Sequence, residues 1–253
     1  MRPNDSPHRG FGADRLASVA EMEGWHFWFV GRRAHLEREL RGRLTPDAGL
    51  VLDLGCGTGA NLRCLAEQGY RILGLDLLPE GLAATHNALP EARLLQATAT
   101  ALPLSEKSVG AAMLLDVLEH VDDERCLAEV WRVLSPGGLA AITVPALPWL
   151  WSYRDQAAGH LRRYTRQRLV RVLTKAGFQP YRVRYFHSFL LPLLVTSRLL
   201  GRRGPAWRDL EERPLPATNW VLSSINRLEA RLSSHITWPL GSSLLAICSK
   251  VEE

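Results

Sequence analysis

The stretch LVLDLGCGTGANL, residues 50–62, decides the fold. A short apolar run holds Asp53 near its end, and three glycines follow at alternate positions, Gly55, Gly57 and Gly59. An apolar pattern with helical spacing comes next, so the glycines join a strand to a helix. Glycines at such a turn let the backbone approach a ligand closely. The stretch therefore predicts a strand–loop–helix unit that binds a ligand.

The same alternation of short apolar strands and amphipathic helices continues to residue 186. Further strands are expected at 71–77, 92–97, 109–116, 139–145, 179–186 and 241–250. Strands of this length, separated by helices, indicate βαβ units and a parallel sheet. We therefore predict an α/β fold: a seven-stranded, mostly parallel, doubly wound sheet with an N-terminal helical segment and a helical insertion before the last strand.

These elements divide the chain into four parts. Residues 1–46 form an N-terminal tail and a helical, aromatic cap, with disorder expected over 1–12. Residues 47–186 form the ligand-binding core, 187–241 the helical insertion, and 242–253 the last strand of the core. The 253 residues, of which 46% are apolar, suffice for one large α/β domain.

Charge and cysteine usage narrow the functional classes. The net charge is +5, but the basic residues are mostly arginines spread along the chain, which is typical of a solvated surface. Nucleic acid is therefore not expected as a partner. The four cysteines have no C-x-x-C spacing and no histidine at ligand distance, so neither a disulfide framework nor a metal site is predicted. The polar N-terminus lacks a secretory signal, and a reduced, cytoplasmic protein fits best.

Two carboxylates indicate the class of ligand. Asp53 lies two residues before the first glycine, where it would repel a pyrophosphate. The same carboxylate suits a ligand that carries an ammonium and a sulfonium group. Asp76 ends the second strand and is placed to accept the hydroxyls of a ribose. A cofactor that is cationic at one end and an adenosine at the other is S-adenosylmethionine.

Five motifs, in this order, resemble those of the class I S-adenosylmethionine-dependent methyltransferases: VLDLGCGTG, LGLD, ATATALP, LLDVLEHVDD and EVWRVLSPGGLAAITVP. The resemblance covers most of residues 50–186 and is strongest to the small-molecule branch, which includes enzymes that methylate quinone precursors. It implies methyl transfer to a small metabolite, and a hydrophobic one is compatible with it. Two alternatives stay open: methylation of RNA or protein, and a Rossmann-like protein that binds the cofactor without catalysis.

The resemblance also implies which residues bind the cofactor: Asp53, Leu54, Gly55, Cys56, Gly57, Gly59, Asp76, Leu77, Thr98, Ala99, Asp116 and Val117. Within this set, Asp76 would bind the ribose and Leu77 would lie against the adenine. At position 98 the branch often has an aspartate for the adenine amino group, whereas this chain has Thr98.

Three side chains are candidates for catalysis. His120 follows the fourth strand and His160 follows the fifth, both at the sheet edge where such folds bind ligands. An imidazole with a pKa near neutrality can accept a proton from the methyl acceptor. Tyr164 would either hydrogen-bond the substrate or cap the cleft. A structural role is the alternative for each of them.

The N-terminal cap carries aromatic residues and arginines in EGWHFWFVGRR, residues 23–33, within a helical pattern that runs from 13 to 43. Trp28, with Trp25, would form a lid over the cofactor. Arg32 or Arg33 would pair with the carboxylate of the cofactor. The alternative is an amphipathic helix that packs on the sheet.

The insertion begins with the apolar, then basic segment FHSFLLPLLVTSRLLGRR and continues into a helix with an apolar stripe at Val221, Ile225, Leu228 and Leu232. For residues 187–203, three alternatives stay open. The segment would be buried core or the face of a homodimer, the wall of a pocket for a hydrophobic substrate, or a contact with an anionic membrane surface.

Overall fold

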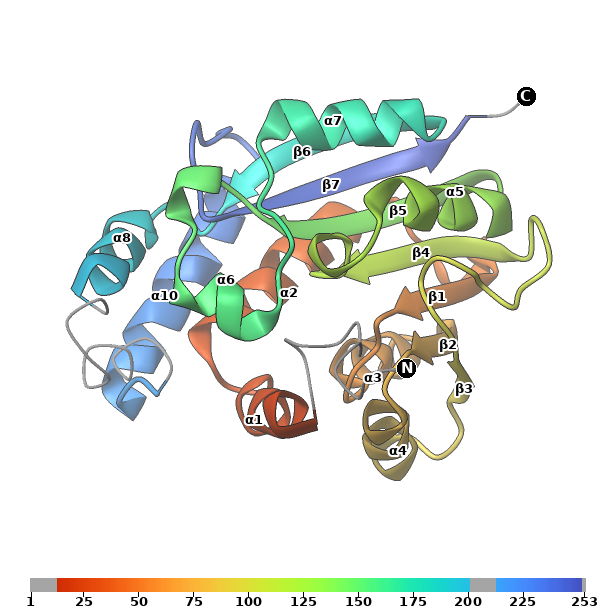
Figure 1. Ribbon diagram of the computed structural model, residues 1–253, viewed down its shortest axis with the longest axis horizontal. Coiled ribbons are helices and arrows are strands. Elements are labelled where there is room, and N and C mark those ends of the chain that lie inside the picture. The colour runs from red at the N-terminus through yellow and green to blue at the C-terminus, as the bar shows by residue number, and fades with distance from the viewer. Residues whose placement is uncertain (1–12, 201–212, 252–253) are drawn as a thin grey trace, which may run out of the picture.

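The computed structural model describes residues 13–200 and 213–251, and shows seven strands in one sheet of order β3-β2-β1-β4-β5-β7-β6 (Figure 1). The strands are β1 (Leu50–Leu54), β2 (Arg71–Asp76), β3 (Arg93–Gln96), β4 (Val109–Leu115), β5 (Leu134–Pro145), β6 (Phe178–Phe186) and β7 (Ser243–Lys250). The expected disorder over 1–12 and the basic pair at 202–203 lie outside the described residues.

The sheet is parallel except at one side. Strands β1 to β5 pair in parallel, and β7 inserts antiparallel between β5 and β6. This confirms the predicted seven-stranded, mostly parallel sheet. No helix in the two described ranges combines the length and the apolar character needed to cross a membrane.

Helices cover both faces of the sheet. They are α1 (Ala13–Met22), α2 (Phe27–Leu40), α3 (Ala60–Glu67), α4 (Pro79–Ala88), α5 (Asp123–Val133), α6 (Tyr153–Ala158), α7 (Arg166–Lys175), α8 (Leu191–Leu200) and α10 (Pro216–Leu232). Leu127 of α5 and Leu169 of α7 join the core on one face, which is nearer the viewer in Figure 1. Leu36 of α2 and Leu65 of α3 join the core on the other face. The fold is therefore doubly wound, as predicted.

The predicted N-terminal helical pattern is two helices rather than one. The chain leaves α1 after Met22, and α2 begins at Phe27. His26 between them has an extended backbone, and its Nδ1 accepts a hydrogen bond from the Trp28 backbone N–H at 3.2 Å. The imidazole thus caps α2 and marks the break between the two helices.

Helix α10 packs against α2 through polar side chains. Asn219 accepts a bond from the Phe27 backbone N–H, and Asn226 donates to the Phe27 carbonyl, each at 2.8 Å. Glu229 accepts the backbone N–H groups of Ser188 and Phe189 at 3.0 Å each. These bonds satisfy the first turn of α2 and the loop before α8, so the insertion is joined to the N-terminal cap.

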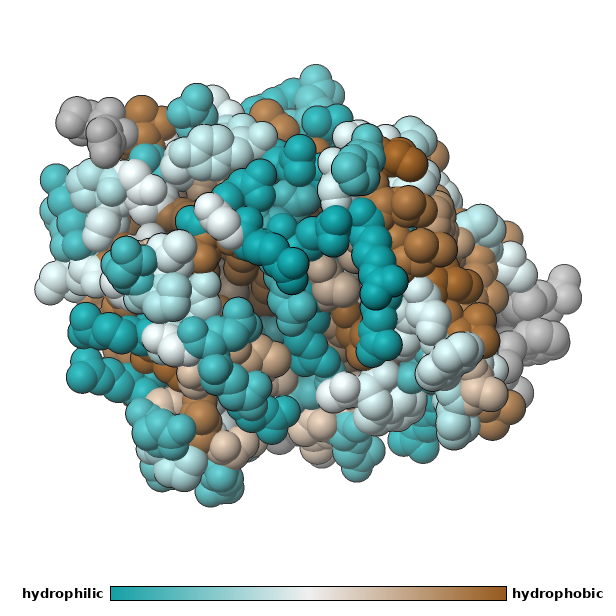
Figure 2. Space-filling view, turned by 180° about the vertical axis from the view of Figure 1, so that it is seen from behind, coloured by the Kyte–Doolittle hydropathy of each residue, from teal (hydrophilic) through white to brown (hydrophobic). Residues whose placement is uncertain are grey.

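The apolar side of the insertion is divided between the interior and the surface. Leu190 and Leu194 are buried with Phe27, whereas Val221 and Leu228 of α10 are about half exposed. Figure 2 shows hydrophobic side chains gathered on the right of the rear view. Buried core is thus shown for part of 187–200, while contacts with a membrane or a second copy stay predictions.

His187 makes stability depend on pH. Burial lowers the pKa of this histidine from 6.5 to about 4, with Arg32 and His26 adding to the effect and with the Asn226 bond and Asp116 opposing it. The unfolded chain therefore binds more protons than the folded protein between pH 6.5 and 4. We expect the folded state to lose about 1.4 kcal/mol per pH unit through this group as the pH falls across that window.

Urea unfolding of the wild type and of His187→Asn at pH 7 and pH 5 checks this expectation. Asparagine tolerates the left-handed backbone at this position, where φ is 56°. The loss of stability between pH 7 and pH 5 should be smaller in the variant by about 2 kcal/mol. An equal loss in both proteins would show that His187 takes up no proton on unfolding.

Candidate functional site

A cavity of about 1030 Å³ lies at the carboxyl ends of β1, β2, β4 and β5. Its walls come from the loops that follow these strands, from α1, and from the first turn of α2. Open α/β sheets bind their ligands at this edge. The cavity is therefore the candidate functional site.

The glycine loop after β1 forms part of the cavity wall. Gly55, Gly57 and Gly59 all have positive φ, at 76°, 55° and 81°. A Cβ on Gly57 would meet only a Leu16 methyl at 3.7 Å, whereas a Cβ on Gly55 would lie 2.7 Å from Cγ2 of Val117. The loop thus exposes backbone to the cavity where a side chain would intrude, which fits a closely held ligand.

Asp76 lies where the sequence places it, at the end of β2. Its Oδ2 accepts the Gly57 backbone N–H at 2.8 Å, and its Oδ1 accepts the Leu78 N–H at 2.9 Å. Leu77, Thr98 and the rest of the predicted adenosine contacts line the same part of the cavity. A carboxylate fixed by two backbone donors retains lone pairs for the hydroxyls of a ribose.

Asp53 lies beneath the glycine loop and outside the cavity lining. Its side chain is 1% exposed, and neither carboxylate oxygen has a hydrogen-bond partner among the described residues. Burial raises the pKa of Asp53 to about 7, with Asp76 and Glu23 adding to the effect and Arg32 opposing it. A cationic ligand group on the loop would offset the cost of this buried carboxylate, which fits an ammonium or a sulfonium.

The two arginines predicted as partners of the cofactor carboxylate, Arg32 and Arg33, bind groups of the protein itself. Arg32 Nη1 lies 2.7 Å from Asp116 Oδ2, and the other oxygen of Asp116 accepts the Thr143 hydroxyl at 2.9 Å. Arg33 donates to the Glu23 carbonyl at 2.8 Å. Arg32 still lines the cavity, but its guanidinium positions Asp116 at the end of β4.

The N-terminal cap forms one wall of the cavity. Trp25 and Trp28 both line it, and Trp28 stacks on His187 with ring centroids 4.3 Å apart. The hydroxyl of Thr58 hydrogen-bonds the carboxylate of Glu23, which joins the end of α1 to the glycine loop. The later turns of α2 pack on the sheet, as the second interpretation of this segment expected. A lid of Trp25 and Trp28 over the cofactor stays a prediction.

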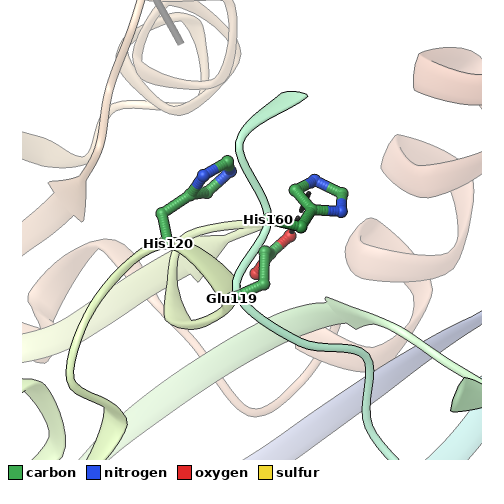
Figure 3. Close-up of side chains that lie close together, drawn as sticks. All are labelled: Glu119, His120 and His160. Carbon is green, nitrogen blue, oxygen red and sulfur yellow. Dashed lines mark ion pairs between the residues drawn. The ribbon is translucent and has the colours of Figure 1, made fainter. Parts of the chain in front are cut away.

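A second group of side chains lines the cavity away from the glycines. His120 ends the short 3-10 helix η2 (Leu118–His120) after β4, and His160 follows α6. Their rings lie 4.9 Å apart, edge to face, and Glu119 points at His160 from the same 3-10 helix (Figure 3). Burial, helped by His160, lowers the pKa of His120 to about 4, so its ring is neutral at pH 7.

Glu119 is a site residue that the sequence interpretation did not single out. Its side chain is fully buried, and burial, together with Asp116, raises the pKa of its carboxyl well above the ordinary value. Its position directly before His120, in the quoted segment LLDVLEHVDD, was the available signal.

Asp155 and Arg163 hold the segment that carries His160. Asp155 Oδ1 lies 3.0 Å from His160 Nδ1 and 2.8 Å from Arg163 Nη1. Arg163 also donates to the carbonyls of Ala146 and Ser242. These bonds, of which those of Arg163 are buried, fix the loop after β5 against the strand ends, so His160 has a defined position.

Tyr164 lies apart from the cavity. It is fully buried in the core of the sheet, and its hydroxyl donates to Asp123 Oδ2 at 2.8 Å. The side chain joins the start of α5 to the loop before α7. Tyr164 is therefore not among the residues that we propose for contact with the substrate.

Comparison with known sequences identifies relatives. Residues 52–142 match the family model described as a methyltransferase domain. An uncharacterized methyltransferase of Mycobacteroides abscessus is 31% identical over 204 residues, which are 78% of this chain and 75% of the relative. One of Mycobacterium tuberculosis is 35% identical over 132 residues, 52% of this chain and 51% of the relative. The chain thus spans about half the length of that relative.

Solved structures share the fold. Phosphoethanolamine N-methyltransferase 2 of Haemonchus contortus, solved with S-adenosylhomocysteine, has a TM-score of 0.63 at 16% identity, covering 94% of this chain and 57% of the other. The [4+2]-cyclase SpnF has a TM-score of 0.58 at 21% identity, covering 88% and 81%. The glycine loop, the strand order and the relatives agree: the chain belongs to the class I S-adenosylmethionine-dependent methyltransferases.

Proposed function

We propose that the enzyme transfers the methyl group of S-adenosylmethionine to a small molecule that enters the cavity beside the cofactor. The observation that carries this proposal is one continuous cavity of about 1030 Å³ that touches both the glycine loop and the pair His120 and His160. Pockets for ligands of drug size span about 300–1,000 Å³, so this volume suits the cofactor together with a small acceptor.

The residues at the glycine loop would hold the cofactor. Gly55 and Gly57 would leave room for its methionine part, Asp53 would favour its cationic groups, and Asp76 would accept the ribose hydroxyls. Leu77 and Thr98 would border the adenine. This assignment follows the motifs of the family and the lining of the cavity.

The opposite end of the cavity would hold the acceptor. Trp25, Trp28 and Phe29 give the cavity an aromatic wall, which would favour an acceptor with apolar surface. Methyl transfer forms a bond from the acceptor lone pair to the methyl carbon, and the electron pair of the broken carbon–sulfur bond stays on sulfur. The protein aligns the reactants, and a proton on the acceptor passes to a base such as a neutral histidine or water. The quinone-precursor branch stays a prediction from the sequence.

Methyl transfer from isotope-labelled S-adenosylmethionine into a fractionated bacterial extract tests the proposal, with Asp53→Ala protein as the blank. We expect label in the small-molecule pool, and label in the organic phase would favour a hydrophobic acceptor. Label in RNA or in protein would contradict the proposed acceptor class. Absence of transfer with the cofactor still bound would contradict the proposed reaction under these conditions.

Replacing Asp76 with alanine should weaken cofactor binding by about 1–3 kcal/mol, a factor of roughly 5 to 150. The change removes the ribose acceptor and leaves the Gly57 and Leu78 N–H groups without their carboxylate. Isothermal titration calorimetry with S-adenosylhomocysteine measures the effect. Asp47→Ala is the control, because Asp47 is an exposed aspartate outside the cavity. Equal affinities of the Asp76 variant and the wild type would exclude the ribose role.

A further inference from the structure

Three potential metal ligands meet at the acceptor end of the cavity. Glu119 and His120 come from η2, and His160 comes from the loop after α6 (Figure 3). One ligand atom from each lies within 4.8 Å of the others, and Glu119 Oε1 lies 4.0 Å from His160 Nε2. The Leu161 backbone N–H donates to the Glu119 carbonyl at 2.7 Å, which holds the two segments together.

The environment of the Glu119 carboxylate suits a bound cation. Its side chain is completely buried, and neither carboxylate oxygen has a hydrogen-bond partner among the described residues. Arg163, the nearby buried guanidinium, donates instead to Asp155 and to two backbone carbonyls. Buried carboxylates are normally paired, hydrogen-bonded or bound to a metal. The carboxylate of Glu119 therefore lacks the partner that its burial calls for.

His160 is oriented in the manner of a ligating histidine. His160 directs Nδ1 at Asp155 Oδ1, 3.0 Å away, and its Nε2 toward Glu119. The His120 ring makes a hydrogen bond to the backbone of Gly159. In metal sites, the ring nitrogen that does not bind the metal usually donates to a carboxylate or to a backbone carbonyl, which fixes the ring. Asp155 is such a partner for His160.

We propose that Glu119, His120 and His160 bind one divalent transition-metal ion in the cavity. Two imidazoles and one carboxylate form a ligand set for zinc and its neighbours in the first transition row, whereas magnesium and calcium prefer oxygen ligands throughout. Ligand atoms around a tetrahedral zinc lie roughly 3.3 Å apart. The three donors would therefore draw together by about 1 Å when the ion binds.

The ion would have a coordination position left for a molecule in the cavity, since the protein supplies three ligands. An oxygen of the acceptor, from a hydroxyl or a carboxylate, suits that position. With the ion bound, His120 and His160 are ligands and not bases, so a proton on the acceptor passes to water. This step toward the acceptor rests on the proposed function, but the binding of the ion does not. The sequence prediction of no metal site is based on the spacing of the cysteines. This cluster contains no cysteine, and it forms only when the loops after β4 and β5 meet.

Metal binding is measured on the full chain alone, without cofactor or acceptor, so its outcome is separate from that of the methylation assay. The untagged protein is dialysed against a chelator and titrated with Co²⁺, whose visible absorption bands report nitrogen and oxygen ligands. Zn²⁺ is then titrated by calorimetry. The variants are Glu119→Gln and His160→Gln, and the control is His86→Gln on the exposed side of α4.

We expect one ion per chain in the wild type and in His86→Gln, and an affinity lower by on the order of 100-fold in each ligand variant. Zn²⁺ at a fixed concentration should also raise the Tm of the wild type more than that of Glu119→Gln, which tests the site even if one variant folds poorly. Absence of bound Co²⁺ and Zn²⁺ in the wild type, or equal binding by the wild type and both ligand variants, would overturn the proposal.

Discussion

Replacing Gly55 with alanine is expected to lower the affinity for S-adenosylhomocysteine by about two orders of magnitude, or roughly 2.7 kcal/mol. The new Cβ would lie 2.7 Å from Cγ2 of Val117, in a backbone with φ of 76° that alanine adopts at a cost. Either the loop or Val117 must move, and both border the cavity. Calorimetric titration and urea unfolding measure the two consequences.

Gly69 provides a matched control for backbone strain. Its φ is 82°, and a Cβ at this position meets nothing within 4 Å. Gly69→Ala should therefore cost about 1–2 kcal/mol of unfolding free energy and leave cofactor affinity unchanged. If Gly69→Ala weakens the cofactor as much as Gly55→Ala does, the effect is one of general stability and not of the loop.

A second substitution separates the contact from the strain. Val117→Ala removes the methyl group that the new Cβ would approach, so Gly55→Ala should cost less in that background than in the wild type. The comparison uses the Val117→Ala single variant as its own reference, because Val117 also lines the cavity. Equal costs in both backgrounds would assign the whole effect to the backbone.

The core of the fold could be predicted because local and global signals agree there. The run LVLDL is apolar enough to be buried on both faces, and β1 has sheet neighbours on both sides. Gly69 and Gly177 follow helices α3 and α7 in left-handed conformations, which glycine adopts readily at a helix end. The seven strands follow from such signals without knowledge of the tertiary structure.

The packing of the insertion could not be predicted as well, because its buried contacts are made by polar residues and not by its apolar stripe. The stripe that contains Val221 and Leu228 is half exposed, whereas Asn219, Asn226 and Glu229 are buried against α2 and the loop after β6. Periodicity ranks positions by hydrophobicity and so assigns such residues to the surface. Their bonds to backbone groups arise only when segments far apart in the sequence meet.

The site shows the same division. Asp76 and the glycines are local features of a strand end and could be placed from the sequence. Glu119 precedes His120 in the sequence, but it approaches His160 only where the loops after β4 and β5 meet, and no spacing in the sequence reports that meeting. Asp155 lies five residues before His160, and its contact with the imidazole depends on the local fold of the loop after β5. The sequence thus predicted the glycine loop, Asp76 and the two histidines that line the cavity, but not the carboxylates beside the histidines.

Replacing Asp155 with alanine is expected to lower the free energy of unfolding by about 3–5 kcal/mol. Arg163 is 5% exposed, and the change removes the only carboxylate within ion-pair distance of its guanidinium among the described residues. The backbone N–H of Ser152 also loses its acceptor at 2.8 Å. Urea unfolding of the wild type and the variant at pH 7 measures this loss.

The pair Asp155 and Arg163 allows a sharper test through a double-mutant cycle. Arg163→Leu removes the charge that Asp155→Ala leaves unpaired, so the double variant should lose less stability than the sum of the two single losses. Asp155→Asn should cost less than Asp155→Ala, because an amide oxygen still accepts one bond. Additive losses would show that the two side chains contribute independently.

Asp155→Asn also tests the orientation of His160, because the Asp155 carboxylate holds the imidazole. If this variant keeps its stability but leaves His160 less constrained, it should bind Co²⁺ more weakly than the wild type does.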